Sequence, residues 1–318
     1  MLRRHLLACA AVLLAGSFVL DAAQAQDKKT LALVTNASAD FWTIARRGTE
    51  KAAKELPNYN IEMYVVSEAT AAAQRQILDN LLTKGVAGVS ISAIDPANST
   101  EILNKVASQA VLFTTDSDAP KSNRVMYIGT DNVAAGVQCG ELIKKALPDG
   151  GKIMLFVGTM GADNARERVE GIKKSLEGTK VEILDIRTDE VDFARAKRNA
   201  EDTLTKYPDI SALVGLWSYN TPQIVEAVRA AGKEGQVKII GFDEDPVTLR
   251  GISDGIIEGT VVQQPFEFGY QSMTLLAKAL EGDRSGIPAN RQVIVPTMVV
   301  RADNVDDFRT KLNALRGR

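Results

Sequence analysis

Histidine and cysteine are almost absent from this sequence. Its 318 residues include one histidine, His5, and two cysteines, Cys9 and Cys139. His5 and Cys9 both fall in a predicted export leader, so the mature chain would have no histidine and one cysteine. Such a chain cannot form a Ser-His-Asp triad, a Cys-His pair, an HExxH zinc site or an intramolecular disulfide. Most hydrolase mechanisms are thereby excluded, whereas chemistry based on carboxylates alone is not.

An excess of charge of either sign is also missing. The chain has 38 Lys and Arg against 40 Asp and Glu, and this near balance gives no reason to expect nucleic-acid binding. Its 45% hydrophobic and 25% charged residues exclude a disordered chain and a polytopic membrane protein, and its length predicts two domains. We expect no metal site, because the acidic run Asp243-Glu244-Asp245 lacks EF-hand spacing.

A long apolar run occurs near the N-terminus. Arg3 and Arg4 precede 15 residues of apolar character, 6–20, and Ala23-Gln24-Ala25 follows. These features are typical of a secretory signal peptide, and the run is short for a bilayer-spanning helix of about 20 residues. We therefore predict that residues 1–25 are a cleavable signal peptide and that the mature protein is periplasmic. The paired arginines leave twin-arginine export open beside the general route.

Apolar, β-branched runs alternate with segments of helical periodicity along the rest of the chain. This order predicts an α/β fold with parallel sheets covered by helices on both faces. Two similar blocks, 31–131 and 132–263, are followed by a helix over 265–280, an extended run over 292–301 and a final helix over 305–315. Such a tail suits two lobes connected by several chain crossovers. The predicted strands are 31–35, 61–66, 88–92, 111–115, 125–128, 152–157, 181–186, 212–216, 237–241 and 259–262.

Aromatic residues are scarce, yet many follow the predicted strands. The chain has two Trp, six Tyr and nine Phe. Ligands of open parallel sheets bind beyond the carboxyl ends of the strands. Aromatic faces beside carboxylates and amides suit a sugar, whose C–H groups pack on rings and whose hydroxyls bind the polar groups. The rings at strand ends are Phe41, Trp42, Phe193, Trp217, Tyr219 and Phe242.

Several motifs, in this order and spacing, carry a family resemblance. They are Leu31-Ala-Leu-Val-Thr-Asn36 with Phe41-Trp42, Phe113-Thr-Thr-Asp-Ser-Asp-Ala-Pro120, Tyr127-Ile-Gly-Thr-Asp-Asn132, Gly161-Ala-Asp-Asn-Ala-Arg-Glu-Arg168, Gly241-Phe-Asp243 and Thr260-Val-Val-Gln-Gln-Pro265. The chain resembles the periplasmic sugar-binding proteins of ABC importers, of the ribose/galactose-binding type.

The resemblance implies the type I periplasmic binding protein fold, in which two Rossmann-like lobes are joined by a three-strand hinge. The N-terminal lobe would be 26–131 plus 264–291, and the C-terminal lobe 132–263 plus 292–318. The hinge would pass through 130–131, 263–264 and a segment near 290–292. By motif, and with Tyr219 added from the strand-end pattern, the ligand-binding residues would be Asn36, Phe41, Trp42, Ser92, Asp116, Asn164, Arg168, Trp217, Tyr219, Asp243 and Gln263.

The chain departs from ribose-type members at two places. They carry Asp-Arg where this chain has Asp116-Ser117, and Asn-Asp where it has Trp217-Ser218. The pocket is therefore expected to be more aromatic and poorer in charge. These departures give no reason to name ribose as the ligand, and a different monosaccharide, a polyol or a larger sugar-like ligand stays open.

The function implied is a monomeric, cofactor-free binding protein that delivers its ligand to an ABC permease and catalyses no reaction. Two alternatives stay open: a receptor for a chemoreceptor or histidine kinase, and a glycosidase using Asp116 and Asp243. The aromatic residues could instead serve packing, and Arg168 could pair with Glu167 or Glu170 on a helix surface.

The signal-peptide prediction is testable on exported protein. The full chain expressed in a Gram-negative host should accumulate in the periplasm with Gln26 as its first residue, as read by intact mass. Ala25→Tyr should block cleavage because the position before the cut requires a small side chain, whereas Gln24→Asn should leave cleavage unchanged. A periplasmic chain that keeps residues 1–25 would contradict the prediction.

Overall fold

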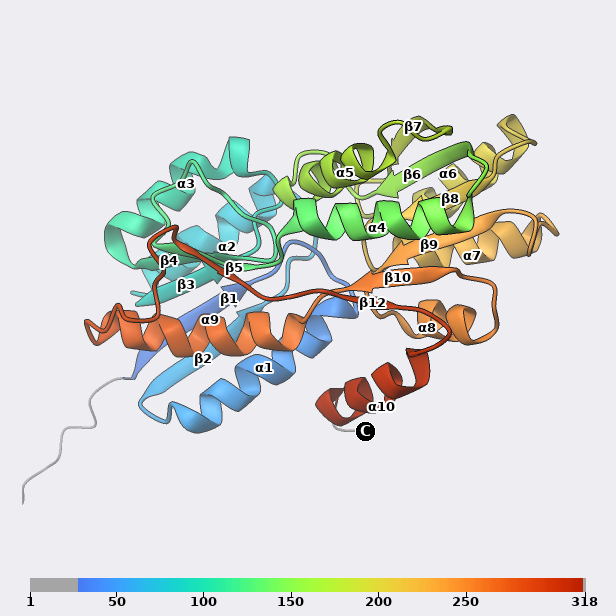
Figure 1. Ribbon diagram of the computed structural model, residues 1–318. Coiled ribbons are helices and arrows are strands. Elements are labelled where there is room, and N and C mark those ends of the chain that lie inside the picture. Colours follow the sequence, from blue (N-terminus) through green and yellow to red (C-terminus); the bar gives the residue numbers. More distant parts are fainter. Residues whose placement is uncertain (1–27, 317–318) are drawn as a thin grey trace, which may run out of the picture.

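The computed structural model describes residues 28–316, so the predicted signal peptide lies outside the described residues. Two α/β lobes lie side by side, and helices flank the sheet of each lobe (Figure 1). Within residues 28–316, no helix combines the length and apolar character needed to cross a membrane.

The N-terminal lobe is built on a six-stranded sheet in the order β11-β5-β4-β3-β1-β2, and all of its neighbouring strands are parallel. Its core strands are apolar and fully buried, as expected for a sheet covered on both faces. The elements are β1 (Lys29–Val34), α1 (Phe41–Glu55), β2 (Tyr59–Tyr64), α2 (Ala71–Thr83), β3 (Gly88–Ile91), α3 (Pro96–Gln109), β4 (Val111–Thr115), β5 (Met126–Gly129), α9 (Pro265–Leu280) and β11 (Gln292–Ile294).

The C-terminal lobe repeats this arrangement with the strand order β12-β10-β9-β8-β6-β7. Its strands are parallel except for the edge strand β12, which pairs antiparallel with β10, so the predicted all-parallel sheet is wrong at that edge. The elements are α4 (Asn132–Ala146), β6 (Gly151–Val157), α5 (Asp163–Leu176), β7 (Val181–Thr188), α6 (Phe193–Lys206), β8 (Ala212–Gly215), α7 (Asn220–Ala230), β9 (Lys238–Phe242), α8 (Pro246–Ser253), β10 (Gly259–Val262), β12 (Met298–Val300) and α10 (Val305–Arg316).

Three chain crossovers join the lobes. The first two, at 130–131 and 263–264, coincide with the expected hinge segments. The third lies at 295–297, because Gln292–Ile294 still pair with β5 of the N-terminal lobe and only Met298–Val300 pair with β10. The predicted lobe boundary between residues 291 and 292 is therefore wrong, because it assigns β11 to the C-terminal lobe. The predicted extended run over 292–301 consists of two short strands, β11 and β12, which belong to different sheets.

The first two crossovers each pass a helix to the other lobe. α4 follows β5 but packs against α5, and α9 follows β10 but packs against α1. Glycines allow both pairs of helices to approach closely. A methyl group on Gly136 of α4 would lie 2.2 Å from the carbonyl oxygen of Arg168, and one on Gly48 of α1 would lie 2.0 Å from that of Phe266. Arg168, a predicted site residue, is thus positioned by a close helix contact.

Gly136→Ala should destabilise the protein, because its new methyl group meets backbone rather than a flexible side chain. We expect a loss of about 1–3 kcal/mol in the free energy of unfolding, measured by urea denaturation. Ala134→Ser, which adds one atom at an exposed position of the same helix, should change it by less than about 0.5 kcal/mol. Equal stability of the two variants would argue against the close contact.

Candidate functional site

A pocket lies between the lobes, at the carboxyl ends of both sheets. Every predicted site residue except Ser92 lines it, together with Ala37, Ala39 and Ser218. The first lobe contributes Asn36, Phe41, Trp42 and Asp116. The second contributes Asn164, Arg168, Trp217, Tyr219 and Asp243, and Gln263 comes from the second crossover.

Asp116 follows β4 and is held in a left-handed backbone conformation, with φ 60°. Its Oδ2 accepts hydrogen bonds from Ser92 Oγ at 2.7 Å and Asn36 Nδ2 at 3.2 Å. Asn36 Oδ1 in turn accepts from Trp42 Nε1 at 3.1 Å. Ser92, fully buried at the end of β3, therefore lies behind the pocket and orients the carboxylate instead of lining the cavity.

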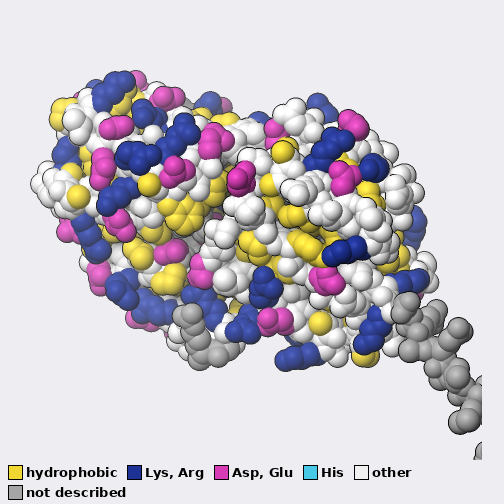
Figure 2. Space-filling model, turned by 180° about the vertical axis from the view of Figure 1, so that it is seen from behind, with side chains coloured by type: hydrophobic (Ala, Val, Ile, Leu, Met, Phe, Trp, Pro, Cys, Tyr) yellow, Lys and Arg dark blue, Asp and Glu magenta, His cyan; other side chains and the backbone are white. Residues whose placement is uncertain are grey.

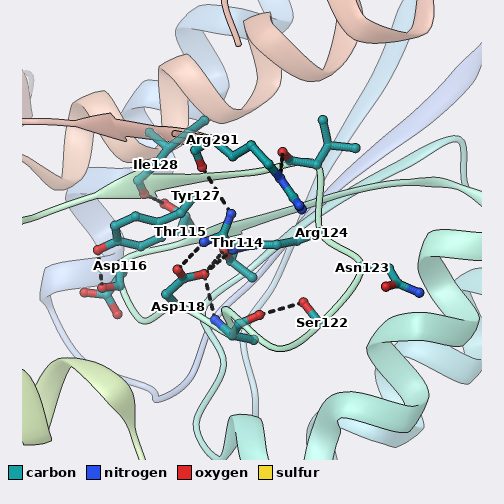
Figure 3. A network of polar contacts seen from close by, with 12 residues as sticks. Thr114, Thr115, Asp116, Asp118, Ser122, Asn123, Arg124, Tyr127, Ile128 and Arg291 are labelled. Atoms are coloured by element: carbon teal, nitrogen blue, oxygen red, sulfur yellow. Dashed lines mark hydrogen bonds and ion pairs between the residues drawn. The ribbon is translucent and has the colours of Figure 1, made fainter. Parts of the chain in front are cut away.

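A second layer of polar contacts fixes the loop that carries Asp116 (Figure 3). The hydroxyl of Tyr127 lies 3.0 Å from the carbonyl oxygen of Asp116 and 2.9 Å from that of Thr130, at the first crossover. Further along the loop, the buried Asp118 carboxylate forms an ion pair with Arg124, whose Nη2 is 2.5 Å from Oδ2. The sequence reading missed this pair, because its partners become neighbours only when the loop folds back.

Asp243 occupies the corresponding position in the second lobe. It follows β9, also has a left-handed backbone (φ 67°), and its Oδ1 accepts from Gln263 Nε2 at 2.9 Å. Gln263 Oε1 accepts from Thr130 Oγ1 at 2.9 Å, which joins the first two crossovers. The carboxylate of the second lobe is therefore bonded directly to the hinge.

Arg168 is 1% exposed, and its hydrogen bonds are to Asn132 and Leu216 rather than to Glu167 or Glu170 on the helix surface. Its Nη1 donates to the carbonyl oxygen of Leu216 at 2.6 Å, its Nε donates to Asn132 Oδ1 at 3.0 Å, and its guanidinium carbon lies 4.4 Å from the ring centre of Phe242. Asn132 is a supporting residue that sequence reasoning missed.

The pocket places two carboxylates and this guanidinium out of water. Burial raises the pKa of Asp116 to about 6, although the bond from Ser92 and the charge of Arg168 oppose the shift. Burial likewise raises the pKa of Asp243, again opposed by Arg168 and by Gln263. The charge of Asp243 also raises the pKa of Asp116. Arg168 thus offsets part of the cost of burying two like charges.

Three buried polar atoms of the pocket residues have no hydrogen-bond partner among the described residues. They are Asn164 Oδ1, Arg168 Nη2 and Trp217 Nε1. Burying such groups unpaired is costly, of order 1–3 kcal/mol each, so their presence in a pocket indicates a polar ligand. The set offers both donors and an acceptor, as a polyhydroxylated ligand requires.

Aromatic rings form the apolar walls. Phe41 and Trp42 meet edge to face at a centroid distance of 5.2 Å, and Trp217 and Tyr219 do so at 6.4 Å. The other two strand-end rings do not line the pocket. Phe193 stacks on Tyr219, and Phe242 packs against Arg168. The strand-end pattern therefore located four lining rings and two supporting ones.

The sequence matches the periplasmic binding protein domain family over residues 31–284. The chain belongs to this family of periplasmic binding proteins. Among curated relatives, the ribose import binding protein RbsB of Haemophilus influenzae is 29% identical over 92% of this chain and 99% of the relative. The D-galactose/methyl-galactoside binding periplasmic protein MglB of the same species is 30% identical over 85% of this chain and 88% of the relative.

Solved structures show the same fold. An ABC transporter solute-binding protein from Burkholderia graminis, in complex with D-arabinose, is 28% identical and superimposes with a TM-score of 0.82. The match covers 88% of this chain and 98% of that protein. The predicted fold class, two α/β lobes of the type I periplasmic binding protein, is confirmed.

Within residues 28–316, no group of three or more His, Cys, Asp or Glu side chains is arranged to hold a metal ion. The acids that follow β9 have separate roles. Asp245 caps α8 by accepting from the backbone N–H of Val247 at 2.7 Å, whereas Glu244 is 2% exposed. Burial, and then the charge of Asp243, raises the pKa of Glu244 well above its usual value.

Asp116→Asn should stabilise the sugar-free protein above pH 6. The pKa of Asp116 is raised on folding, so the native state holds its proton between about pH 4 and 6, and stability falls as pH rises through that window. Asparagine removes the ionisable group and tolerates a left-handed backbone. The gain in melting temperature should therefore be larger at pH 8 than at pH 4, as measured by differential scanning calorimetry. Asp149→Asn, in an exposed turn, should show no such difference.

Proposed function

We propose that this protein captures a monosaccharide or polyol in the periplasm and delivers it to the permease of an ABC importer. The observation that carries the proposal is the interlobe pocket, where two buried aspartates and an arginine face four aromatic rings. Membership of the periplasmic binding protein family supports it, and so do relatives named for ribose and galactose binding and a structural neighbour in complex with D-arabinose.

Each pocket aspartate uses one carboxylate oxygen for hydrogen bonds within the protein and leaves the other for the ligand. Asp116 uses Oδ2 to bind Ser92 and Asn36, and Asp243 uses Oδ1 to bind Gln263. The second oxygen of each carboxylate is left for ligand hydroxyls, in charge-assisted hydrogen bonds of about 1.5–3 kcal/mol. Each aspartate comes from a different lobe, so one sugar bound to both holds the lobes together.

Ligand binding would favour the closed arrangement of the lobes. A ligand that contacts both lobes interacts with the closed form more strongly than with an open one and shifts the population accordingly. Gln263 and Thr130 lie at the crossovers and connect to Asp243, so the binding site and the hinge share side chains. The closed form would present a surface from both lobes to the permease.

The alternatives are less well supported. The curated relatives are named as binding proteins, which does not favour a glycosidase, and two are named for import or periplasmic binding rather than sensing. We infer that the protein acts as a monomer, and over the face shown in Figure 2 Lys and Arg side chains are intermixed with Asp and Glu. The predicted signal peptide accounts for a periplasmic location.

A thermal-shift screen of monosaccharides and polyols tests the proposal. A ligand present at about 100 times its dissociation constant should add about 2.7 kcal/mol to the stability of the folded state. Asp243→Asn keeps the left-handed backbone accessible but should weaken binding about tenfold or more, because a charge-assisted hydrogen bond is lost. Asp254→Asn, exposed after α8, is the matched control. A full panel without any shift in melting temperature would overturn the proposal.

A further inference from the structure

Trp217 and Tyr219 form the aromatic wall that the second lobe contributes to the pocket. This wall is supported by a buried carboxylate that does not line the pocket. Asp189, directly after β7, is 0% exposed. Its Oδ1 accepts from the hydroxyl of Tyr219 and from the backbone N–H of Val191, the latter at 2.9 Å, and its Oδ2 accepts from Asn220 Nδ2 at 2.9 Å. Asp189 thus ties its own loop to the loop between β8 and α7.

The loop that carries Asp189 has an unusual backbone. Glu190 and Val191 are consecutive residues in the left-handed region, with φ 54° and 63°. That conformation is disfavoured for a β-branched residue, so it persists only where surrounding contacts enforce it. The bond between Val191 N–H and Asp189 is one such contact. Directly after this turn, α6 begins with Phe193, whose ring stacks on Tyr219 at 4.6 Å between centroids.

Tyr219 therefore lies between the pocket and the protein surface. It lines the pocket and is 5% exposed, whereas Phe193 on its other face is 40% exposed. Gly158 of the loop after β6 leaves room for the wall: a Cβ there would lie 2.2 Å from Cζ3 of Trp217 and 2.8 Å from the hydroxyl of Tyr219. The Tyr219 ring therefore packs against Phe193 and Trp217, and Gly158 lies beside its hydroxyl. Asp189 accepts the hydrogen bond from that hydroxyl.

We propose that Asp189 is a positioning residue that fixes Tyr219 as the wall limiting ligand size, so that the pocket accepts an unsubstituted monosaccharide better than its glycosides. This inference rests on the proposed sugar-binding function. An asparagine at 189 keeps the shape but offers one acceptor oxygen instead of two and carries no charge, so at least one of the bonds from Tyr219, Val191 and Asn220 is lost and the others become weaker. The hydroxyl of Tyr219 then has a weaker anchor, and its ring can shift together with the stacked, partly exposed Phe193.

The same arrangement makes the wall sensitive to acid. Burial raises the pKa of Asp189 to about 6, opposed by the bonds from Tyr219, Val191 and Asn220. Glu190 on the same loop adds to the rise, and the groups that face Asp189 from the next loop are the phenol of Tyr219 and the neutral amide of Asn220. Protonation below about pH 6 converts one acceptor oxygen into a donor and loosens the wall.

A sugar-free measurement tests the anchor itself. In a Trp42→Phe/Asp116→Asn background, which removes the pocket carboxylate that also titrates near pH 6, emission from Trp217, the neighbour of Tyr219, should change with a midpoint near pH 6. Asp189→Asn should abolish this transition, whereas Asp185→Asn, on the exposed side of β7, should retain it. A transition that survives in Asp189→Asn would overturn the proposal. Far-UV circular dichroism establishes that each variant is folded.

A binding measurement tests the selectivity. Isothermal titrations would use D-galactose with methyl β-D-galactopyranoside, and D-ribose with methyl β-D-ribofuranoside. Asp189→Asn and Tyr219→Phe should each shift the affinity ratio toward the methyl glycoside about tenfold, and the double variant should shift it no further than Tyr219→Phe alone, because both changes act on the same hydrogen bond. An unchanged ratio, or additive shifts, would refute the positioning role. If no sugar binds the unaltered protein, the proposed function fails, and the sugar-free experiment still decides whether Asp189 anchors the wall.

Discussion

The guanidinium of Arg168 faces two carboxylates that come from opposite lobes, and the pocket depends on this arrangement of charge. Burial raises the pKa of both Asp116 and Asp243, and Arg168 acts against both shifts. The arginine is itself held by the carbonyl oxygen of Leu216 and by Asn132. Its placement depends on the close contact of α4 and α5 at Gly136, so a packing detail outside the pocket controls the electrostatics inside it.

The two lobes have the same architecture, and each contains one helix that follows a strand of the other lobe. α4 and α9 each follow a strand of one lobe and pack in the other, and the crossovers that lead into them carry Thr130 and Gln263. A hydrogen bond joins these two residues, and Gln263 continues to Asp243. A change in the angle between the lobes therefore acts directly on a ligand-facing carboxylate. This is the physical connection between closure and binding in the proposed function.

Much of the site was predictable, since the carboxyl ends of parallel strands meet at one edge of a sheet. Asp116 and Asp243 each follow a buried strand, and that position alone places them at the pocket. Ser92 also follows a strand, but its hydroxyl donates a hydrogen bond to Asp116, and the residue lies behind the pocket instead of lining it. Asp189 carries no motif of its own, because its role comes from a strained turn and from a partner 30 residues away in the sequence.

The sequence by itself determined the α/β class, the strand-end residues and, for residues 28–316, the lack of any histidine and of a second cysteine. Periodicity and composition are local properties, which is why the chain order of strands and helices could be read directly. The division of 292–301 between two sheets, the antiparallel edge strand β12 and the anchoring of Tyr219 by Asp189 were decided only by the tertiary structure. Each depends on which distant segment a backbone or carboxylate meets, and no local pattern records that choice.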